Sequence, residues 1–423
     1  MKILFLTLEF ADPVFSGNGI WGRSLVRGLL QFKESLHVTV VCGGPIRNGD
    51  LLEPPVPWPE ASEAAWGQRL EVRVVGLPLW GRLDRGCSWS EYAAHVANEF
   101  ASATQPEGDH PLPFDLVLGL DWHSYFALEA LEQARAALPP YVFLNVRVFS
   151  ANPGLSDEDR AWYRAAEAKA IRRASSVIAQ TQRDADLLGS LLDPETCPEV
   201  TSVAPRIALH CPLREDLRQL AIESQVDEGD TAKRKYLLCV SRLSPEKNLE
   251  AFIGAIEGLG VEELRKAGII PLLMGAKMEP AEYSDSLLER FKAACPFAEY
   301  GSFRPPSELA KIYQQTRLYF HAALQEPYGM SPVEAAAFGV PALMNEDGIG
   351  SAERLRPSHG ESLAAPMKDP LAVAEVLKDT LTNSSRLAEV GQRARARALE
   401  WSEGHFAAAV MEELEKTQVQ VGA

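Results

Sequence analysis

The sequence predicts an α/β protein with two Rossmann-like domains that face a central cleft. The chain has 423 residues, more than the roughly 250–300 residues at which a single hydrophobic core stops growing. Short apolar runs alternate with longer amphipathic segments, which is typical of a parallel, doubly wound sheet. This alternation lapses once, over residues 216–235, and then starts again.

The first alternating series predicts an N-terminal domain over residues 1–215. Its strands are expected at residues 2–8, 38–42, 72–76, 115–120, 142–146 and 177–180. Its helices include residues 20–32, 92–103 and 157–174. The polar, glycine-containing stretch 224–230 is expected at the join to the next domain, or just after it.

The second series predicts a C-terminal domain over residues 216–402. Its strands are expected at residues 236–241, 269–274, 298–300, 318–321 and 341–344. Residues 403–423 contain a terminal helix that we expect to pack back on the N-terminal domain. Ligands of such folds bind at the carboxyl ends of the strands, so the loops after strands are where functional residues are expected.

Composition narrows the range of partners and compartments. The formal net charge of −16 disfavours nucleic acid as a main partner. No apolar stretch approaches the ~20 residues that cross a bilayer, so no transmembrane segment is expected. The apolar N-terminus is followed at once by Glu9 and Asp12, so it is interpreted as a strand. None of the six cysteines forms a C-x-x-C pair, which indicates reduced thiols in a cytoplasmic protein.

A glycine-rich segment, Gly17-Asn18-Gly19, formally begins a G-x-G-x-x-G pattern. The first strand ends near Leu8, well before these glycines, and the second strand lacks a terminal acid. Both features disfavour a dinucleotide site. We interpret the segment as a loop that opens a helix and turns backbone amides toward an anion. A turn without a ligand is the alternative.

The segment from Glu326 to Glu334 contains a predicted helix start. Ser331 suits the N-cap position, Pro332 the first helical position, and Glu334 the third, which together form a capping box. This pattern predicts a helix over residues 332–338. Glu334 therefore has a structural explanation that needs no ligand.

The same helix start is a predicted anion site. Amides near Gly329, Met330 and Ser331 would be free, and the helix dipole favours negative charge there. Glu326 lies just ahead, where a carboxylate would repel a phosphate. A polyhydroxyl group between the two resolves this conflict, so the pattern favours a sugar diphosphate.

Two cations follow the strand at residues 236–241. Arg242 and Lys247 would lie at its carboxyl end, ahead of a helix. In an acidic protein they form a candidate phosphate clamp. The alternative is a pair of solvated surface charges.

Together these motifs resemble glycosyltransferase family 4 and its relatives, which include glycogen, starch and sucrose synthases. Glu326 and Glu334 match the family's E-x7-E signature, and Arg242 and Lys247 match its donor-phosphate cations. The glycine loop, the segment Asp121-Trp122-His123 and Trp401-Ser402 also resemble family segments. The fold that this resemblance implies is GT-B.

The resemblance also implies roles for the candidate residues. Arg242 and Lys247 would neutralise the leaving diphosphate. Glu326 would bind hydroxyls of the donor sugar, and Glu334 the nucleotide ribose. Tyr300 would lie near the base, and His123 would contact the sugar near the reacting carbon.

The predicted reaction is retaining, metal-independent transfer of a hexose from a nucleotide diphosphate sugar to a hydroxyl acceptor, without a cofactor. No evident pair of carboxylates supports double displacement, which favours same-face attack. The acceptor is a sugar, a lipid-linked group or a small molecule, and the loops 46–70 and 77–89 would select it. An epimerase, a phosphorylase and a non-catalytic nucleotide-sugar binder are the alternatives.

Two further patterns have structural explanations. The D-x-D segments at 157–159 and 184–186 are attributed to helix starts and helix interiors, so no metal site is predicted. The arginines of residues 393–397 are interpreted as a solvated helix face, with contact to an acidic membrane as the alternative.

Overall fold

The structure is a computed structural model of the chain. It describes residues 1–11, 14, 16–47, 50–51, 66–101, 112–134, 137–192, 204–224, 233–278 and 281–422. Cys197, residues 225–230 of the expected join, and residues 48–49 and 52–65 of the loop 46–70 lie outside the described residues. The chain divides into two compact units: Met1–Pro212 with Glu403–Ala423, and Leu213–Ser402. We call them the first and the second unit.

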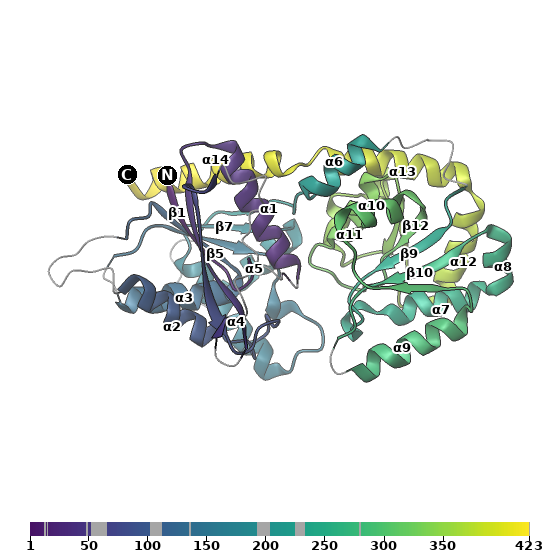
Figure 1. Cartoon of the computed structure of the whole chain (residues 1–423), viewed down its shortest axis with the longest axis horizontal. Helices are drawn as coiled ribbons and strands as arrows, with labels where there is room; N and C mark the ends of the chain where they lie inside the picture. The colour runs from purple at the N-terminus through teal and green to yellow at the C-terminus, as the bar shows by residue number, and fades with distance from the viewer. Residues whose placement is uncertain are drawn as a thin grey trace. The chain divides into compact units, whose positions relative to one another are not determined.

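The first unit is built on an eight-stranded sheet in the order β3-β2-β1-β5-β6-β7-β8, with β4 paired to β2 (Figure 1). Among the described residues every pair is parallel except β2 with β3. The strands are β1 (Lys2–Leu6), β2 (His37–Arg47), β3 (Asp50–Leu51), β4 (Leu70–Leu77), β5 (Leu116–Leu120), β6 (Tyr141–Asn145), β7 (Ser176–Ala179) and β8 (Arg206–Ala208).

Helices cover both faces of this sheet. On one face α2, α3 and α4 enclose a core with Leu4, Val117 and Phe143, whereas α1 and α14 lie on the other (Figure 1). Strands β1, β5 and β6 are apolar throughout most of their length because both faces are buried. The helices are α1 (Gly17–Phe32), α2 (Trp89–Ala101), α3 (Asp121–Ala134), α4 (Asp157–Arg173), α5 (Gln182–Ser190) and α14 (Glu403–Gly422).

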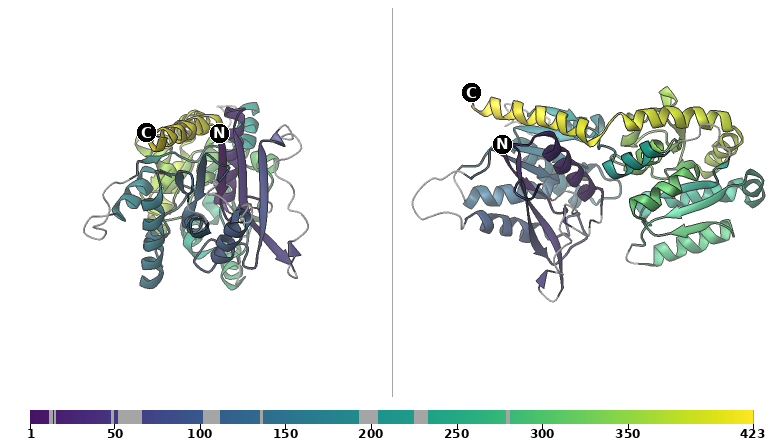
Figure 2. Two further views of the ribbon diagram at one scale, coloured as in Figure 1. Left: turned by 90° about the vertical axis from the view of Figure 1, so that its left-hand side faces the viewer. Right: turned by 45° about the horizontal axis from the view of Figure 1, so that its top comes forward.

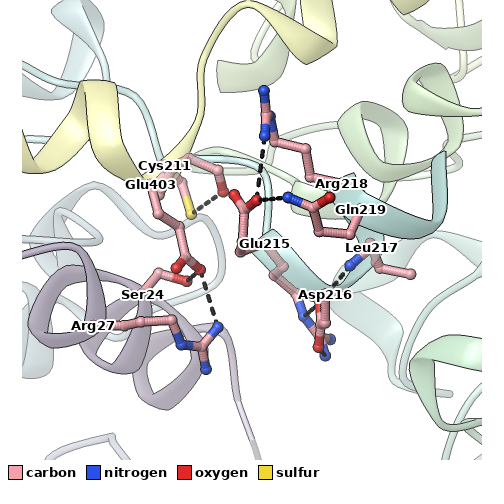
Figure 3. A network of polar contacts seen from close by, with 11 residues as sticks. Ser24, Arg27, Cys211, Glu215, Asp216, Leu217, Arg218, Gln219 and Glu403 are labelled. Atoms are coloured by element: carbon pink, nitrogen blue, oxygen red, sulfur yellow. Dashed lines mark hydrogen bonds and ion pairs between the residues drawn. The ribbon is translucent and has the colours of Figure 1, made fainter. Parts of the chain in front are cut away.

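The last helix, α14, packs against α1, the first helix of the same unit (Figure 2). The rings of Trp21 and Phe406 meet with centroids 5.5 Å apart. Figure 3 shows the buried Glu403 carboxylate between two side chains of α1. Ser24 Oγ donates to it at 2.7 Å, and Arg27 Nη1 lies 3.4 Å away. The C-terminal end of the chain therefore completes the first unit.

The second unit has a six-stranded parallel sheet in the order β11-β10-β9-β12-β13-β14. Strands β9 and β12, at its centre, pair in parallel from Tyr236↔Thr316 to Leu238↔Tyr319, although the 75 residues 241–315 separate the two strands in the sequence. The strands are β9 (Tyr236–Val240), β10 (Ile270–Met274), β11 (Glu299–Gly301), β12 (Thr316–Phe320), β13 (Ala342–Asn345) and β14 (Leu363–Ala365).

Helices also cover both faces of the second sheet. Helices α7, α9 and α12 enclose one core with β9 and β12, and α6, α10, α11 and α13 pack together on the other face (Figure 1). The helices are α6 (Glu215–Glu223), α7 (Leu249–Leu259), α8 (Val261–Ala267), α9 (Ala281–Ala294), α10 (Pro306–Gln314), α11 (Met330–Ala337), α12 (Pro370–Thr382) and α13 (Ser384–Leu399). The predicted fold class, two Rossmann-like α/β domains, is confirmed.

The basic run on α13 is more than a solvated face. Arg395 donates to Ala337 O at 2.6 Å and to Ala221 O at 2.8 Å, near the C-terminal ends of α11 and α6. Arg397 donates to Glu400 at 2.7 Å and Arg354 O at 3.3 Å. The prediction of a solvated face is therefore wrong for these two arginines, because Ala337 O, Ala221 O and Arg354 O are distant from them in the sequence and only the fold brings these carbonyls near.

None of the helices, over their described residues, has both the length and the apolar composition of a membrane span.

Candidate functional site

The candidate phosphate cations follow β9 in the second unit. The chain leaves the strand at Val240 and forms a short 3₁₀ helix, Pro245–Lys247. Asn248 has a φ of 50°, and this left-handed residue starts α7. Arg242 is half-buried, and its Nη2 lies 3.4 Å from Glu246 Oε1. Both cations are thus held near the carboxyl edge of the sheet, where ligands of such folds bind.

Glu326 comes from the loop after β12, the strand beside β9. Its amide donates to Gly348 O at 2.9 Å, and its carbonyl accepts from the Gly350 amide at 3.0 Å, so the backbone is fixed on both sides. Its carboxylate forms an ion pair and hydrogen bond with Lys247 Nζ. Both side chains are 17% exposed. The fold therefore joins two of the predicted catalytic residues.

Helix α11 begins at Met330, and Gly329 is its N-cap with a φ of 84°. Glycine adopts this left-handed backbone without strain. No side chain caps the helix, so the predicted capping box is wrong. The helix starts earlier than the sequence pattern indicated. Its N-cap is Gly329 instead of Ser331, because glycine allows the left-handed backbone from which the helix begins. The start of the helix lies beside Glu326, because a Cβ at Gly329 would be 3.2 Å from Glu326 Cγ.

Ser331, the predicted N-cap, has a different contact. It lies in the first turn of α11, and its Oγ accepts a hydrogen bond from Tyr319 Oη at 2.6 Å. Tyr319 Oη also lies 3.2 Å from Val240 O at the end of β9. The buried tyrosine therefore ties the start of α11 to the strand that precedes Arg242.

Glu334, the second acid of the signature, is buried within the second unit. Its Oε2 accepts a hydrogen bond from Tyr313 Oη of α10 at 3.2 Å, instead of capping α11. Burial raises the pKa of Glu334, and the positive charge of Arg214 partly offsets this effect. Arg214 in turn donates to Asp216 at 2.7 Å. A buried acid with a tyrosine and an arginine nearby was not predicted, because both partners are distant in sequence.

Tyr300, predicted near the nucleotide base, lies in β11 at the edge of the same sheet. Its hydroxyl donates to Gly275 O at 3.0 Å, just after β10. Its position at the carboxyl end of the strand agrees with a place among the site loops, but its hydroxyl already has a backbone partner.

In the first unit, Gly17, Asn18 and Gly19 form the first turn of α1 rather than a loop ahead of it. Ser16 is the N-cap, and its Oγ accepts from the Asn18 amide at 3.1 Å. The buried Glu9 carboxylate binds both the amide and the hydroxyl of Ser16. A Cβ at Gly19 would lie 2.9 Å from the Glu9 side chain, so close packing explains this glycine.

Asp121 connects this helix start to the sheet. It is the first residue of α3, with a φ of 56°. Its Oδ2 accepts from Asn18 Nδ2 at 2.6 Å, and its Oδ1 from the Val146 amide at 2.8 Å. Burial raises the pKa of Asp121 to about 7. In the sequence, Asp121 was identified only through the family resemblance. Its place directly after a buried strand also indicates a functional residue, because ligands of such folds bind at the carboxyl ends of strands.

His123 is fully buried in the first turn of α3. Neither ring nitrogen has a hydrogen-bond partner among the described residues. Burial lowers the pKa of His123 to about 3, so the ring is neutral. Its neighbour Trp122 lies 5.3 Å away, centroid to centroid. A buried imidazole without a partner is unusual in a stable core.

The two D-x-D segments lie at helix starts in the first unit. Ser156 caps α4, and Asp159 lies 3.1 Å from Arg85. Thr181 caps α5 through the Asp184 amide. In the part of the chain that the structure describes, no group of three or more histidines, cysteines, aspartates and glutamates could hold a metal ion.

Sequence comparison identifies the region that contains the second-unit site. Residues 222–397 match the family model described as "Glycosyl transferases group 1". The match indicates a glycosyltransferase. This is the enzyme class that the sequence analysis predicted, and the matched region contains Arg242, Lys247, Glu326 and Glu334. A search of curated protein sequences finds no match.

Solved structures of other proteins share this fold over nearly the whole chain. Alr3699/HepE from Anabaena has a TM-score of 0.67 at 18% identity, over 98% of this chain and 100% of that one. Sucrose-phosphate synthase from Thermosynechococcus elongatus has a TM-score of 0.72 at 16% identity, over 100% of both chains. The α,α-trehalose 6-phosphate synthase of Burkholderia multivorans has a TM-score of 0.70 at 13% identity, over 99% of both. At these identities the likeness shows the GT-B fold.

Proposed function

We propose that the protein is a retaining glycosyltransferase of the family 4 type, which moves a hexose from a nucleotide diphosphate sugar to a hydroxyl acceptor without a metal ion. The observation that carries this proposal is the meeting of Lys247 and Glu326 beside Gly329, the residue at which α11 starts. A cation, a carboxylate and free helix amides suit a ligand with both phosphates and hydroxyls.

The Lys247–Glu326 ion pair gives each group a partner when no donor is bound. On donor binding, Lys247 would turn to the diphosphate together with Arg242 and the amides of Met330 and Ser331. Glu326 would then accept hydrogen bonds from sugar hydroxyls. Each charge thus exchanges one partner for another, and neither is left buried and unpaired.

The same groups would assist the chemical step. As the bond from the anomeric carbon to the phosphate oxygen breaks, negative charge develops on the leaving diphosphate. Arg242, Lys247 and the α11 dipole would stabilise that charge. A leaving phosphate oxygen would accept the acceptor's proton, and same-face attack would retain the anomeric configuration. Glu334 would bind the ribose, Tyr300 would lie near the base, and His123 would contact the sugar.

UDP sugars are the first donors to test, because the Anabaena protein was solved in complex with UDP and glucose. UDP, GDP, ADP and their glucose conjugates are screened by thermal shift, since a ligand of the folded state raises the melting temperature. Transfer is then measured with the stabilising conjugate and a panel of sugar acceptors, with and without EDTA. We expect acceptor-dependent release of nucleoside diphosphate that survives EDTA.

Several results would contradict this proposal. Conversion of the sugar nucleotide to an epimer without acceptor would identify an epimerase. Nucleotide binding without turnover by any acceptor in the panel would favour a non-catalytic binder. Activity lost in EDTA and restored by Mg²⁺ or Mn²⁺ would overturn the metal-independent mechanism.

The predicted cytoplasmic location stays a prediction.

A further inference from the structure

A buried imidazole borders the candidate donor site. His321 directly follows β12, and its amide donates to Leu343 O at 2.9 Å, so the backbone is held in the sheet. The residue is 6% exposed. Its Nε2 has no hydrogen-bond partner among the described residues. Buried polar atoms are nearly always paired, so an unpaired one at a ligand site calls for a partner from the ligand.

The neighbours of the ring define where Nε2 lies. A Cβ at Gly329 would be 3.5 Å from both Cε1 and Nε2 of His321, and 3.2 Å from Glu326 Cγ. The imidazole and Glu326 therefore lie around the residue that starts α11. The ring of Tyr319 stacks on the imidazole, with centroids 6.3 Å apart. Nε2 is thus beside the place where the predicted phosphate and sugar contacts meet.

The charge state of the ring selects the kind of ligand group. Burial, with a smaller effect of Lys247, lowers the pKa of His321 to about 4, although Glu326 acts in the opposite direction. The ring is neutral at physiological pH, with one nitrogen that donates and one that accepts. A hydroxyl both donates and accepts, so it pairs with either tautomer. Lys247 and the α11 amides already offer positive potential for a phosphate.

We propose that His321 Nε2 hydrogen-bonds a hydroxyl of the donor sugar, next to the hydroxyl that Glu326 holds, and thereby helps to select the sugar. This inference rests on the proposed function, because it assumes that a nucleotide sugar binds at Glu326. It goes beyond that function by naming a specificity-determining contact that is neither an acid nor a cation.

The test compares binding of a nucleotide sugar with binding of the free nucleotide. His321→Phe keeps a planar ring and removes both nitrogens, whereas His321→Gln keeps a polar group. Affinities for UDP, UDP-glucose and UDP-galactose are measured by calorimetry, or those for the GDP or ADP set if wild type prefers it. His359→Gln, at an exposed histidine of the same unit, is the control.

We expect His321→Phe to bind the free nucleotide like wild type and the preferred nucleotide sugar about tenfold more weakly. Its preference between the two epimeric sugars should shrink, and His321→Gln should restore part of the loss. Equal affinity changes for nucleotide and nucleotide sugar, or none, would overturn the inference while leaving the proposed function intact. If His321→Phe fails to fold, the affinities of His321→Gln for the nucleotide and the two nucleotide sugars decide the question. A changed preference between the epimeric sugars would support the inference, and an unchanged preference would overturn it. Wild type that binds no nucleotide sugar would overturn both.

Discussion

At the scale of single residues, the second-unit site is governed by paired opposite charges. Lys247 and Glu326 form an ion pair whose side chains are 17% exposed, so solvent screens it only in part. Because Lys247 is attracted to Glu326, a diphosphate must compete with that carboxylate for the ammonium group. Free nucleotide, which brings no sugar to Glu326, gains nothing from the acid.

Glu326→Gln should therefore bind free nucleoside diphosphate more tightly than wild type, because the competing charge is gone. Its turnover should fall, because the sugar loses its strongest acceptor. Lys247→Met should instead weaken nucleotide binding by about 1.5–3 kcal/mol, the contribution of a charge-assisted hydrogen bond. Calorimetric Kd values for UDP, GDP and ADP and turnover on each variant check this. Weaker nucleotide binding in both variants would contradict a competing pair.

Asp121 gives a prediction about pH. Burial raises its pKa from 3.8 to about 7. Between these values the folded protein holds a proton that the unfolded chain releases, so this group's contribution to stability falls as pH rises. His123 and His321 contribute the opposite slope, because burial lowers their pKa values. Only the difference in stability between wild type and a variant at Asp121 isolates the contribution of this carboxyl group.

Asp121→Asn removes this titration, keeps an oxygen acceptor, and tolerates the left-handed backbone. Wild type should lose stability relative to Asp121→Asn between pH 4.5 and pH 7.5, two conditions that enclose most of the interval from 3.8 to about 7. Melting temperatures of both proteins at the two pH values provide the measurement. A difference between them that does not depend on pH would show that Asp121 keeps an ordinary pKa.

At the scale of elements, helix ends are held by side chains from other helices. Arg395 of α13 donates to Ala337 O at the last residue of α11 and to Ala221 O in α6. The last carbonyls of a helix have no partner within the helix. One guanidinium therefore joins three helices, one of which starts at the candidate donor site.

Arg395→Ala should lower the free energy of unfolding by about 1–3 kcal/mol, because carbonyls partly shielded from water lose a charged donor. Arg393→Ala is the matched control on the same helix, since Arg393 is exposed, and it should stay within about 0.5 kcal/mol of wild type. Urea unfolding of both variants gives the comparison. Equal effects would mean that the two hydrogen bonds contribute no net stability.

At the scale of the whole molecule, the chain closes the first unit with its last helix. The contact between α1 and α14 is close at Gly28, where a Cβ would lie 2.8 Å from Glu403 O and 2.9 Å from Ala407 Cβ. At Gly22, on the same helix, a Cβ would be 3.5 Å from Phe5, an ordinary contact. Alanine substitutions at these two glycines therefore separate the effect of helix propensity from the effect of helix packing.

Gly28→Ala should destabilise the protein by about 1–3 kcal/mol, because a methyl group meets backbone that cannot yield without moving α14. Gly22→Ala should be neutral or stabilising by up to about 1 kcal/mol, the difference in helix propensity. Thermal unfolding of the two variants tests this. A Gly28→Ala protein as stable as Gly22→Ala would indicate that α14 does not pack tightly on α1.

The sequence by itself determined the fold class, the order of the longer strands along the chain, and the residue types of the second-unit site, whereas the short strands β3, β8 and β14 were not predicted. Those features are local: apolar periodicity is set within one element, and a signature such as Glu326 and Glu334 lies within one segment. Even so, a local rule failed at α11, where Gly329 rather than Ser331 begins the helix.

Only the tertiary structure decided which side chains meet. Lys247 and Glu326 are 79 residues apart, and Asn18 and Asp121 are 103 apart. Parallel strands bring such residues to one edge of a sheet, and no periodicity in the sequence encodes which pairs result. Burial is likewise a property of the packed chain, because the neutral state of His321 and the raised pKa of Asp121 follow from the removal of water around them.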